Sequence, residues 1–310
     1  MPSAGRAAVP AARAGTSADR AGRPAGRRVV GFGDNVVDRF VDRGVLYPGG
    51  NCVNFAVFAR RMGVESAYLG VFGTDDAAAH IRAALADLGV ATDRCAVREG
   101  ETGWCDVRVV DGDRIFGDWA GGVVLDRPFE PDPADLDYLA EFDLVHLGPY
   151  AALEGSLPAL RERCPLVSFD LSDEPEQRDP AYLDAVAPHV DLAIVSAAEL
   201  AWDEAERLAR DVHARGAALC LVTRGVEGSG LFDGETLHRA DAVRVEALDT
   251  MGAGDAFITA FALTLLDQGW ARGLIPEAET INRALAAAAA FAAEQCSAEG
   301  AFGYAKEIVQ

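Results

Sequence analysis

A Gly-Ala-Gly turn followed by an aspartate is the segment of this sequence best suited to chemistry. Residues 252–255 read Gly-Ala-Gly-Asp, and an apolar stretch follows them. Small residues let a ligand approach the backbone closely, and the N–H groups at a helix start form an anion site. Asp255, held beside that site, could accept a proton from a hydroxyl that attacks a phosphoryl group. The alternative is a glycine turn whose aspartate only favours the helix start.

A second candidate segment lies near the front of the chain. Gly49-Gly50 precedes Asn51 and Asn54, and the pair of glycines allows a tight approach to the backbone. Asn51 and Asn54 are three residues apart, so their amides share one face of a helix, where they could bind sugar hydroxyls. Taken alone, Asn51 is more often a helix N-cap.

The elements between these segments must position them. From residue 29 onward, short apolar runs alternate with helical stretches, which is typical of a parallel sheet covered by helices on both faces. The expected strands are 29–33, 67–73, 144–148, 166–171, 192–196 and 219–223. The expected helices are 51–62, 76–88, 151–163, 198–214, 254–268 and 277–294.

Residues 103–119 break this alternation. The runs 103–110 and 114–119 read as consecutive strands joined by Asp111-Gly112-Asp113, which has the chemistry of a hairpin turn. We therefore expect a small β flap beside the main sheet, formed from about residues 36–48 and 103–120. One face of such a flap needs cover, from a substrate or from a partner flap, and this predicts a homodimer.

Charge and apolar length restrict the partners. The net charge is −21, and residues 1–28 carry six arginines and one aspartate, so the rest of the chain carries −26. A body this acidic repels nucleic acid and anionic membranes. The apolar runs are far shorter than the roughly 20 residues that cross a bilayer. We predict a soluble protein that binds neither nucleic acid nor membrane.

The two remaining compositional signals concern the cysteines and the N-terminus. Six scattered cysteines form no CxxC pair, so the sequence predicts neither structural zinc nor a disulfide framework, and it favours the cytoplasm. Residues 1–27 show no apolar periodicity and are predicted to be a disordered extension. An arginine-rich targeting peptide is the alternative.

Three segments of the chain resemble motifs of one family. Residues 248–257 (LDTMGAGDAF) resemble the signature of the ribokinase-like (PfkB) carbohydrate kinases, and residues 49–54 (GGNCVN) with 70–75 (GVFGTD) resemble its earlier motifs. The resemblance spans about residues 29–305. It implies a kinase domain over residues 28–310, with an α/β fold in which a doubly wound, mostly parallel sheet carries a small β-sheet lid.

The resemblance also implies roles at the catalytic end of the site. Asp255 matches the catalytic base of the family, and Asp249 and Thr250 fall where members often hold a monovalent cation such as K⁺. The anion hole that stabilises the transferring phosphate matches the backbone of Gly252, Ala253 and Gly254.

Substrate binding is implied for two further segments. Asp38 aligns with the family's substrate-binding aspartate after the first strand. Its sugar-binding segment matches Gly50, Asn51 and Asn54.

Nucleotide binding is implied by residues 223–228. Thr223, Gly225 and Gly228 match the nucleotide-binding T-x-G-x-x-G, so ATP with Mg²⁺ is the expected phosphoryl donor system. The family's N-x-x-E motif reads Ser196-Ala-Ala-Glu199 here, which keeps the carboxylate that positions Mg²⁺, through water, but replaces the asparagine.

Within the family, the sequence is most similar to the fructoselysine 6-kinase branch. The similar segments are 33–38 (GDNVVD), 113–119 (DRIFGDW), 142–146 (FDLVH) and 169–173 (FDLSD). This implies a fructosamine substrate, phosphorylated on its 6-hydroxyl. Asp118 would suit its ammonium group and Arg114 its carboxylate, although both residues suit a solvated hairpin face equally well.

Three other functions share parts of this pattern. A different PfkB sugar kinase, similar to fructokinase or ribokinase, shares the same motifs. A non-catalytic sugar sensor could share the scaffold, but it has no need of a proton acceptor such as Asp255. A dinucleotide-dependent oxidoreductase needs G-x-G-x-x-G after the first strand, and residues 31–36 carry Val36 at the third glycine position.

Overall fold

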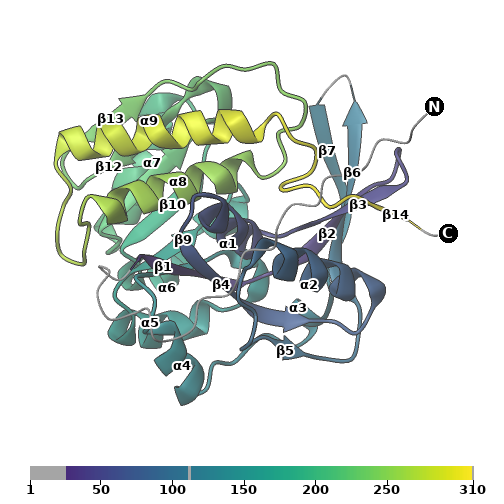
Figure 1. Cartoon of the computed structure of the whole chain (residues 1–310). Helices are drawn as coiled ribbons and strands as arrows, with labels where there is room; N and C mark the ends of the chain where they lie inside the picture. The colour runs from purple at the N-terminus through teal and green to yellow at the C-terminus, as the bar shows by residue number, and fades with distance from the viewer. Residues whose placement is uncertain (1–25, 111–112, 309–310) are drawn as a thin grey trace, which may run out of the picture.

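Two β-sheets organise the chain (Figure 1). The structure is a computed structural model that describes residues 26–110 and 113–308, without the side chains of residues 109, 110, 113 and 114. Most of the predicted N-terminal extension, residues 1–25, lies outside the described residues.

The larger sheet runs in the order β13-β12-β11-β10-β9-β8-β1-β4-β5. Its pairings are parallel except for the two made by β12, which are antiparallel. The predicted doubly wound, mostly parallel sheet is therefore confirmed. Its strands are β1 (Arg28–Gly33), β4 (Glu65–Phe72), β5 (Ala96–Val97), β8 (Leu144–Leu147), β9 (Val167–Asp170), β10 (Leu192–Ser196), β11 (Leu219–Thr223), β12 (Ser229–Phe232) and β13 (Leu237–Ala240).

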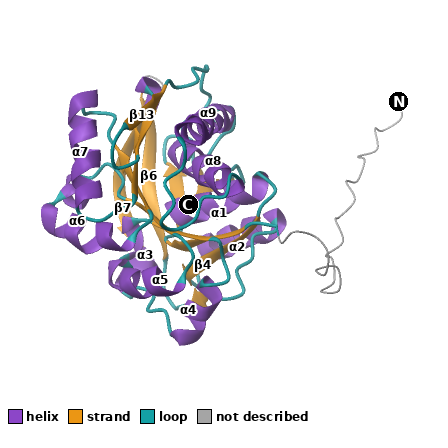
Figure 2. Cartoon of the chain, turned by 90° about the vertical axis from the view of Figure 1, so that its left-hand side faces the viewer, coloured by secondary structure: helices purple, strands orange, loops and turns teal. Residues whose placement is uncertain are grey.

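Helices cover both faces of this sheet, with α6 and α7 on one side and α8 and α9 on the other (Figure 2). No helix in the part of the chain that the structure describes is long and apolar enough to span a bilayer. The helices are α1 (Asn51–Arg61), α2 (Asp76–Leu88), α3 (Gly122–Asp126), α4 (Pro133–Leu139), α5 (Leu157–Arg163), α6 (Pro180–Val186), α7 (Trp202–Ala214), α8 (Ala253–Asp267) and α9 (Ala278–Gln295).

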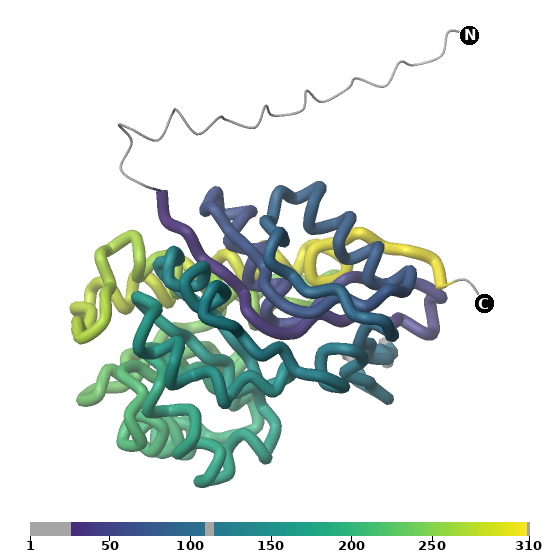
Figure 3. Tube along the Cα trace, turned by 90° about the horizontal axis from the view of Figure 1, so that it is seen from below, coloured from purple at the N-terminus to yellow at the C-terminus, as the bar shows by residue number. Residues whose placement is uncertain are grey.

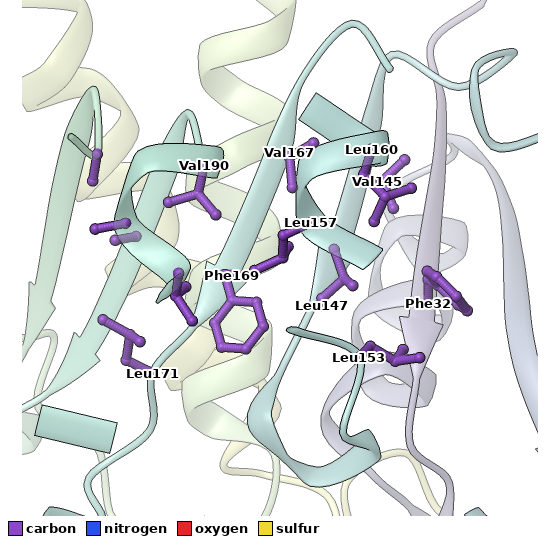
Figure 4. Close-up of a cluster of buried hydrophobic side chains, with 14 of the residues drawn as sticks. Phe32, Val145, Leu147, Leu153, Leu157, Leu160, Val167, Phe169, Leu171 and Val190 are labelled. Carbon is purple, nitrogen blue, oxygen red and sulfur yellow. The ribbon is translucent and has the colours of Figure 1, made fainter. Parts of the chain in front are cut away.

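The continuous apolar strands fit this double cover because successive side chains point to opposite faces. Val29 belongs to the buried cluster that includes α8 and α9, whereas its neighbour Val30 belongs to the cluster that includes α5, α6 and α7. Figure 4 shows the cluster that includes Val30, in which Leu160 of α5 lies beside the strand residue Val145. Helices and apolar side chains thus cover both faces of the sheet, which leaves the ends of its strands for a site.

The smaller sheet runs in the order β14-β3-β2-β6-β7. Strands β2 and β6 pair in parallel and the other neighbours pair antiparallel. Figure 3 shows the last described residues running beside the early strands. The predicted flap segments lie in this sheet, and their action as a lid stays a prediction. Its strands are β2 (Val36–Phe40), β3 (Val45–Gly49), β6 (Thr102–Val110), β7 (Asp113–Gly121) and β14 (Lys306–Glu307).

Two helices begin later than the sequence predicted. The helix expected from residue 198 begins at Trp202, because Ala197 N–H instead donates to the Thr223 carbonyl and Glu204 caps the Ala201 N–H. The helix expected from residue 151 begins at Leu157, after two short 3-10 turns. The hairpin of β12 and β13 was not predicted, since its two four-residue strands carry little apolar alternation.

Candidate active site

The first turns of α1 and α8 meet at one place. Asn51 Nδ2 donates to Asp255 Oδ1 at 2.9 Å, and Asn54 Nδ2 donates to Asp255 Oδ2 at 2.6 Å. Asp255 lies 204 positions after Asn51 and 201 positions after Asn54 in the chain. The structure therefore brings the two predicted site segments together, with Asp255 between both asparagines.

Glycine is needed where α8 begins. Gly252 is the N-cap of α8 with a φ of 72°, in the left-handed region that only glycine adopts easily. A Cβ there would lie 2.8 Å from the Cβ of Ala301, so space is also restricted. The turn before it is held by Asp249, whose carboxylate accepts from Met251 N–H at 2.7 Å and Gly300 N–H at 3.0 Å.

The start of α1 is held by a buried carboxylate. Asp34, just after β1, accepts from the N–H groups of Asn51 at 2.8 Å and Cys52 at 3.1 Å, and so satisfies two donors of the first helical turn. Gly50 has a φ of 109°, and a Cβ there would lie 2.9 Å from Asp34 Oδ2. The Gly-Gly pair therefore lets β3 turn into α1 directly over Asp34.

Asn51 connects four elements through one amide. Its Nδ2 also donates to Asp170 Oδ2 at 2.9 Å, at the end of β9, while its Oδ1 lies 3.1 Å from His146 Nε2 in β8. Asp170 in turn accepts from the Ser172 N–H at 2.8 Å. The carboxyl ends of parallel strands thus deliver polar groups to the starts of α1 and α8, as expected for an open α/β sheet.

Three carboxylates share this site: Asp34 and Asp170 are buried, and Asp255 is half-buried. Burial raises the pKa of Asp255 well above its usual range, and the negative charges of Asp170 and Asp34 raise it further, while the hydrogen bonds from Asn54 and Asn51 oppose the shift. Burial likewise raises the pKa of Asp170 to about 6 and raises the pKa of Asp34. Such shifts are typical of functional sites.

Asp38 lies on the smaller sheet, where it was predicted to bind substrate. It is buried in β2, in register with Tyr47 of β3 and Cys105 of β6. A Cβ on Gly49 would come within 2.5 Å of its carboxylate, so glycine is required beside it. Gly49 leads directly into α1, which places Asp38 next to the strand that enters the site.

A cavity of about 580 Å³ opens beside the start of α8. It is predominantly apolar, with Phe257 and the α9 residue Ala289 among its walls. The predicted site residues in its lining are Ser196, Thr223, Gly225, Gly228, Thr250, Ala253 and Gly254. The predicted nucleotide segment and the predicted anion turn therefore border one cavity of a size that suits a small ligand.

The predicted anion hole is only partly available. Ala253 N–H donates to the Thr250 carbonyl at 3.1 Å, which closes the turn into α8. An anion at this helix start would therefore be met by the N–H groups of the neighbouring residues and by the positive end of the helix.

Glu199 lies outside the cavity lining. Its side chain is 52 % exposed and forms an ion pair with Arg178, whose guanidinium also donates to the Ser196 carbonyl at 2.7 Å. Ser196 Oγ itself lies 3.3 Å from Thr223 Oγ1, within the cavity wall. No group of three or more His, Cys, Asp or Glu side chains that could hold a metal ion is found among residues 26–110 and 113–308. The role of Glu199 toward Mg²⁺ stays a prediction.

Two further predicted residues have partial descriptions. Asp249 is buried and already accepts two backbone N–H groups, so its role in holding a monovalent cation with Thr250 stays a prediction. Arg114 lies in β7, paired with Val109 of β6, but its side chain is outside the described residues.

Three site residues were not predicted from the sequence: Asp34, Asp170 and His146. Each lies at or beyond the carboxyl end of a main-sheet strand, which is the signal that could have found them. Their segments were noted only as points of similarity to a family, without a role for the individual side chains.

The fold is that of the ribokinase-like kinases. Arabidopsis thaliana ribokinase in complex with ribose and ATP superposes with a TM-score of 0.73 at 21% identity, covering 90% of this chain and 95% of that one. Aminoimidazole riboside kinase from Salmonella enterica superposes with a TM-score of 0.70 at 22% identity, covering 90% and 96%. At these identities the comparison concerns the fold.

The chain belongs to the pfkB family of carbohydrate kinases, which it matches over residues 25–305. It is a sugar kinase, which transfers phosphate to a hydroxyl group. It is similar to fructosamine kinase FrlD of Bacillus subtilis, with 37% identity over 279 residues, 89% of this chain and 93% of the relative. It is also similar to fructoselysine 6-kinase of Escherichia coli, with 34% identity over 272 residues, 87% of this chain and 98% of the relative.

Proposed function

We propose that this kinase uses ATP to phosphorylate the 6-hydroxyl of a fructosamine such as fructoselysine. The observation that carries the proposal is the position of Asp255. Asp255 is half-buried in the first turn of α8, its carboxylate is held by two asparagine amides, and its turn borders the cavity. A proton acceptor beside an anion-binding helix start is what transfer of phosphate to an alcohol requires.

The reaction follows from these groups. Asp255 takes the proton of the attacking hydroxyl while the hydroxyl oxygen forms its bond to the γ-phosphorus. The bond between that phosphorus and the β,γ-bridging oxygen breaks, and ADP leaves with the bond's electron pair. The start of α8 faces the charge that develops on the transferring group, where its N–H groups and positive end stabilise it.

The cavity supports ATP as the donor. Its apolar walls from α8 and α9 suit a flat base, and the segment from Thr223 to Gly228 suits phosphates. Mg²⁺ fits as an ion held mainly by phosphates and water, because it keeps several of its waters and the Glu199 carboxylate is exposed to solvent. Glu199 would hold it through water, and the ion would neutralise phosphate charge. A monovalent cation such as K⁺ at Asp249 and Thr250 belongs to the same proposal.

A fructosamine suits the charge of the site. Asp34, Asp38 and Asp170 are buried near the start of α1 and Asp255 is half-buried beside them, an environment that favours a substrate carrying an ammonium group. We propose that Asp38, Gly50, Asn51 and Asn54 bind the sugar, while Arg114 meets the carboxylate of the amino-acid part. The fructosamine and fructoselysine kinases among the relatives support this substrate class.

A phosphorylation screen tests the proposal. The purified chain is given ATP, Mg²⁺ and one of fructoselysine, fructose, ribose or a nucleoside, and ADP release is measured. We expect the highest kcat/KM with fructoselysine, and the product identified as the 6-phosphate by NMR. Preference for free fructose or ribose would favour another PfkB sugar kinase. Binding of sugar without any ADP release would favour a sugar sensor.

We propose that the protein is a homodimer formed through the smaller sheet. Its proposed location is the cytoplasm. Strand β7 is an edge strand, and its exposed side chains include Ile115, Phe116 and Trp119. An apolar edge strand of this kind is usually covered, and a second copy of the same sheet would cover it. Light scattering at micromolar concentration should give the mass of a dimer, and Phe116→Glu should shift it toward that of a monomer.

A further inference from the structure

His146 lies beneath the active site with both ring nitrogens engaged. It is fully buried in β8, and its ring stacks on Phe55 of α1 with centroids 4.4 Å apart. Nδ1 lies 2.9 Å from Ser168 Oγ in the neighbouring strand β9, and Nε2 lies 3.1 Å from Asn51 Oδ1. No step of the proposed reaction uses this side chain.

The direction of each hydrogen bond can be worked out from Asn51. Asp170 and Asp255 both lie 2.9 Å from the same amide atom, and carboxylates accept, so that atom is the NH₂ nitrogen. The amide oxygen therefore faces His146 and can only accept, so Nε2 must carry the proton. Burial lowers the pKa of His146 to about 3, which keeps the ring neutral. Nδ1 is then an acceptor, and the Ser168 hydroxyl donates to it.

The result is a polarised chain of donors: Ser168 to His146, His146 to Asn51, and Asn51 to both Asp170 and Asp255. Reversal of the Asn51 amide would direct an oxygen at two carboxylates and an NH₂ group at an N–H donor. Both contacts would then be repulsive. The Nε2–H tautomer of His146 thus allows only one orientation of the amide.

We propose that His146 is a positioning residue for phosphoryl transfer, because it fixes the Asn51 amide so that one NH₂ group serves both site carboxylates. Through that amide, His146 holds Asp255 in place and favours its ionised form, which is the form that accepts a proton. This inference rests on the proposed function of Asp255. Removal of the His146 donor leaves the Asn51 amide oxygen without this buried partner, so the amide is held less firmly and its hydrogen bond to Asp255 weakens.

The Asn51 amide is an important donor to Asp255 because of the other titratable groups around that carboxylate. The carboxylates of Asp170 and Asp34 face it, and the buried thiol of Cys52 and the neutral ring of His146 lie close by. None of these four groups contributes a positive charge. The two asparagine amides are the groups that favour the ionised form of Asp255, so loss of either should raise its pKa.

A matched pair of variants tests the role. His146→Leu keeps an apolar volume without a donor, whereas His146→Gln places an NH₂ group near the position of Nε2. In His146→Leu, we expect the acid limb of the pH profile of kcat/KM with the preferred sugar to move upward by about one pH unit. At pH values below the midpoint of the shifted limb, kcat should be about tenfold lower than in the wild type. His146→Gln should restore most of both, and Ser168→Ala should move the limb in the same direction by less.

If the wild type is active and the acid limb stays in place in His146→Leu, the inference is overturned and the kinase function is left intact. A wild-type protein without turnover would instead contradict the proposed function. The tautomer can be read without activity. In ¹⁵N-histidine-labelled protein, the resonances lost in His146→Gln should be those of a neutral Nε2–H ring that does not titrate between about pH 5 and 9. An Nδ1–H ring, or a titrating one, would contradict the proposal even if His146→Leu does not fold.

Discussion

Asn54 Nδ2 lies 2.6 Å from Asp255 Oδ2, so the helix that carries the predicted sugar-binding segment also holds the proposed catalytic carboxylate. Both asparagines donate to Asp255, one to each oxygen. A change on α1 should therefore alter the reaction rate as well as the binding of the sugar.

Asp255→Asn should lower turnover by at least about 10²-fold with little change in substrate affinity, because the variant keeps the shape and loses the basicity. The introduced amide would accept from one of the two asparagines on α1 and present its own NH₂ group to the other. Circular dichroism and the melting temperature check that the fold is kept. Steady-state kinetics within a few-fold of the wild type would show that Asp255 only starts the helix.

Asp170→Asn should stabilise the unliganded protein at alkaline pH. The pKa of Asp170 is about 6 in the folded chain, above its value near 4 in an unfolded chain, so the folded state binds the proton more tightly. The ionised carboxylate therefore costs stability above about pH 6, and this cost vanishes below about pH 4. At pH 8 the variant should gain about 1–2 kcal/mol, or roughly 2–6 °C in melting temperature.

The stability gain of Asp170→Asn should shrink as the pH falls toward 4. The turnover of this variant should be lower than that of the wild type at every pH. Parallel thermal melts of wild type and variant at several pH values measure the difference. A gain that does not depend on pH would mean that the carboxylate is not the source.

Gly254→Leu should block the cavity that we propose as the nucleotide site. A Cβ at Gly254 meets nothing within 4 Å, and the residue lines the cavity, so a larger side chain fills the space without strain. We expect ATP affinity to fall at least about tenfold by calorimetry, or about 1.4 kcal/mol. Gly155→Leu is the matched control, since its Cβ is equally free and it lies outside the cavity lining. Equal ATP affinity in both variants would move the nucleotide site elsewhere.

Asp191 should matter for stability alone. Its carboxylate is 2% exposed and accepts from Arg272 at 2.8 and 3.0 Å, from Arg161, and from the Val167 N–H at 2.9 Å. Asp191→Leu leaves these donors unpaired and should cost about 3–5 kcal/mol in urea unfolding. Arg163→Ala removes an exposed pair with Asp137 and should cost less than about 1 kcal/mol. The kcat of folded Asp191→Leu should match the wild type.

The parts of the site that sequence could predict are those with local causes. The Gly-Ala-Gly-Asp turn and the Gly-Gly-Asn segment carry their own backbone requirements, and both were predicted at the correct helix starts. His146 and Asp170 could not be assigned because their roles depend on strand register. His146 pairs with Ser168 only when β8 and β9 align, and only then does its Nε2 point to Asn51.

The parallel sheet was predictable for a similar reason, since each apolar strand and amphipathic helix is specified within its own segment. Strand β14 was not, because Lys306 and Glu307 carry no apolar alternation and pair with β3 only through tertiary structure. The lid segments were found from the hairpin chemistry of residues 111–113, yet the fifth strand of their sheet comes from the far end of the chain.

That distant strand sets an order of events during synthesis. Strands β2 and β3 leave the ribosome early, but the outer edge of β3 is covered only when residues 306–307 arrive. Ala301 closes over Gly252 in the same late segment, and Gly300 secures Asp249. A polypeptide interrupted before residue 300 would therefore expose an unpaired strand edge and lack the support of its catalytic turn. We therefore expect a chain that ends before residue 300 to be inactive and prone to aggregation.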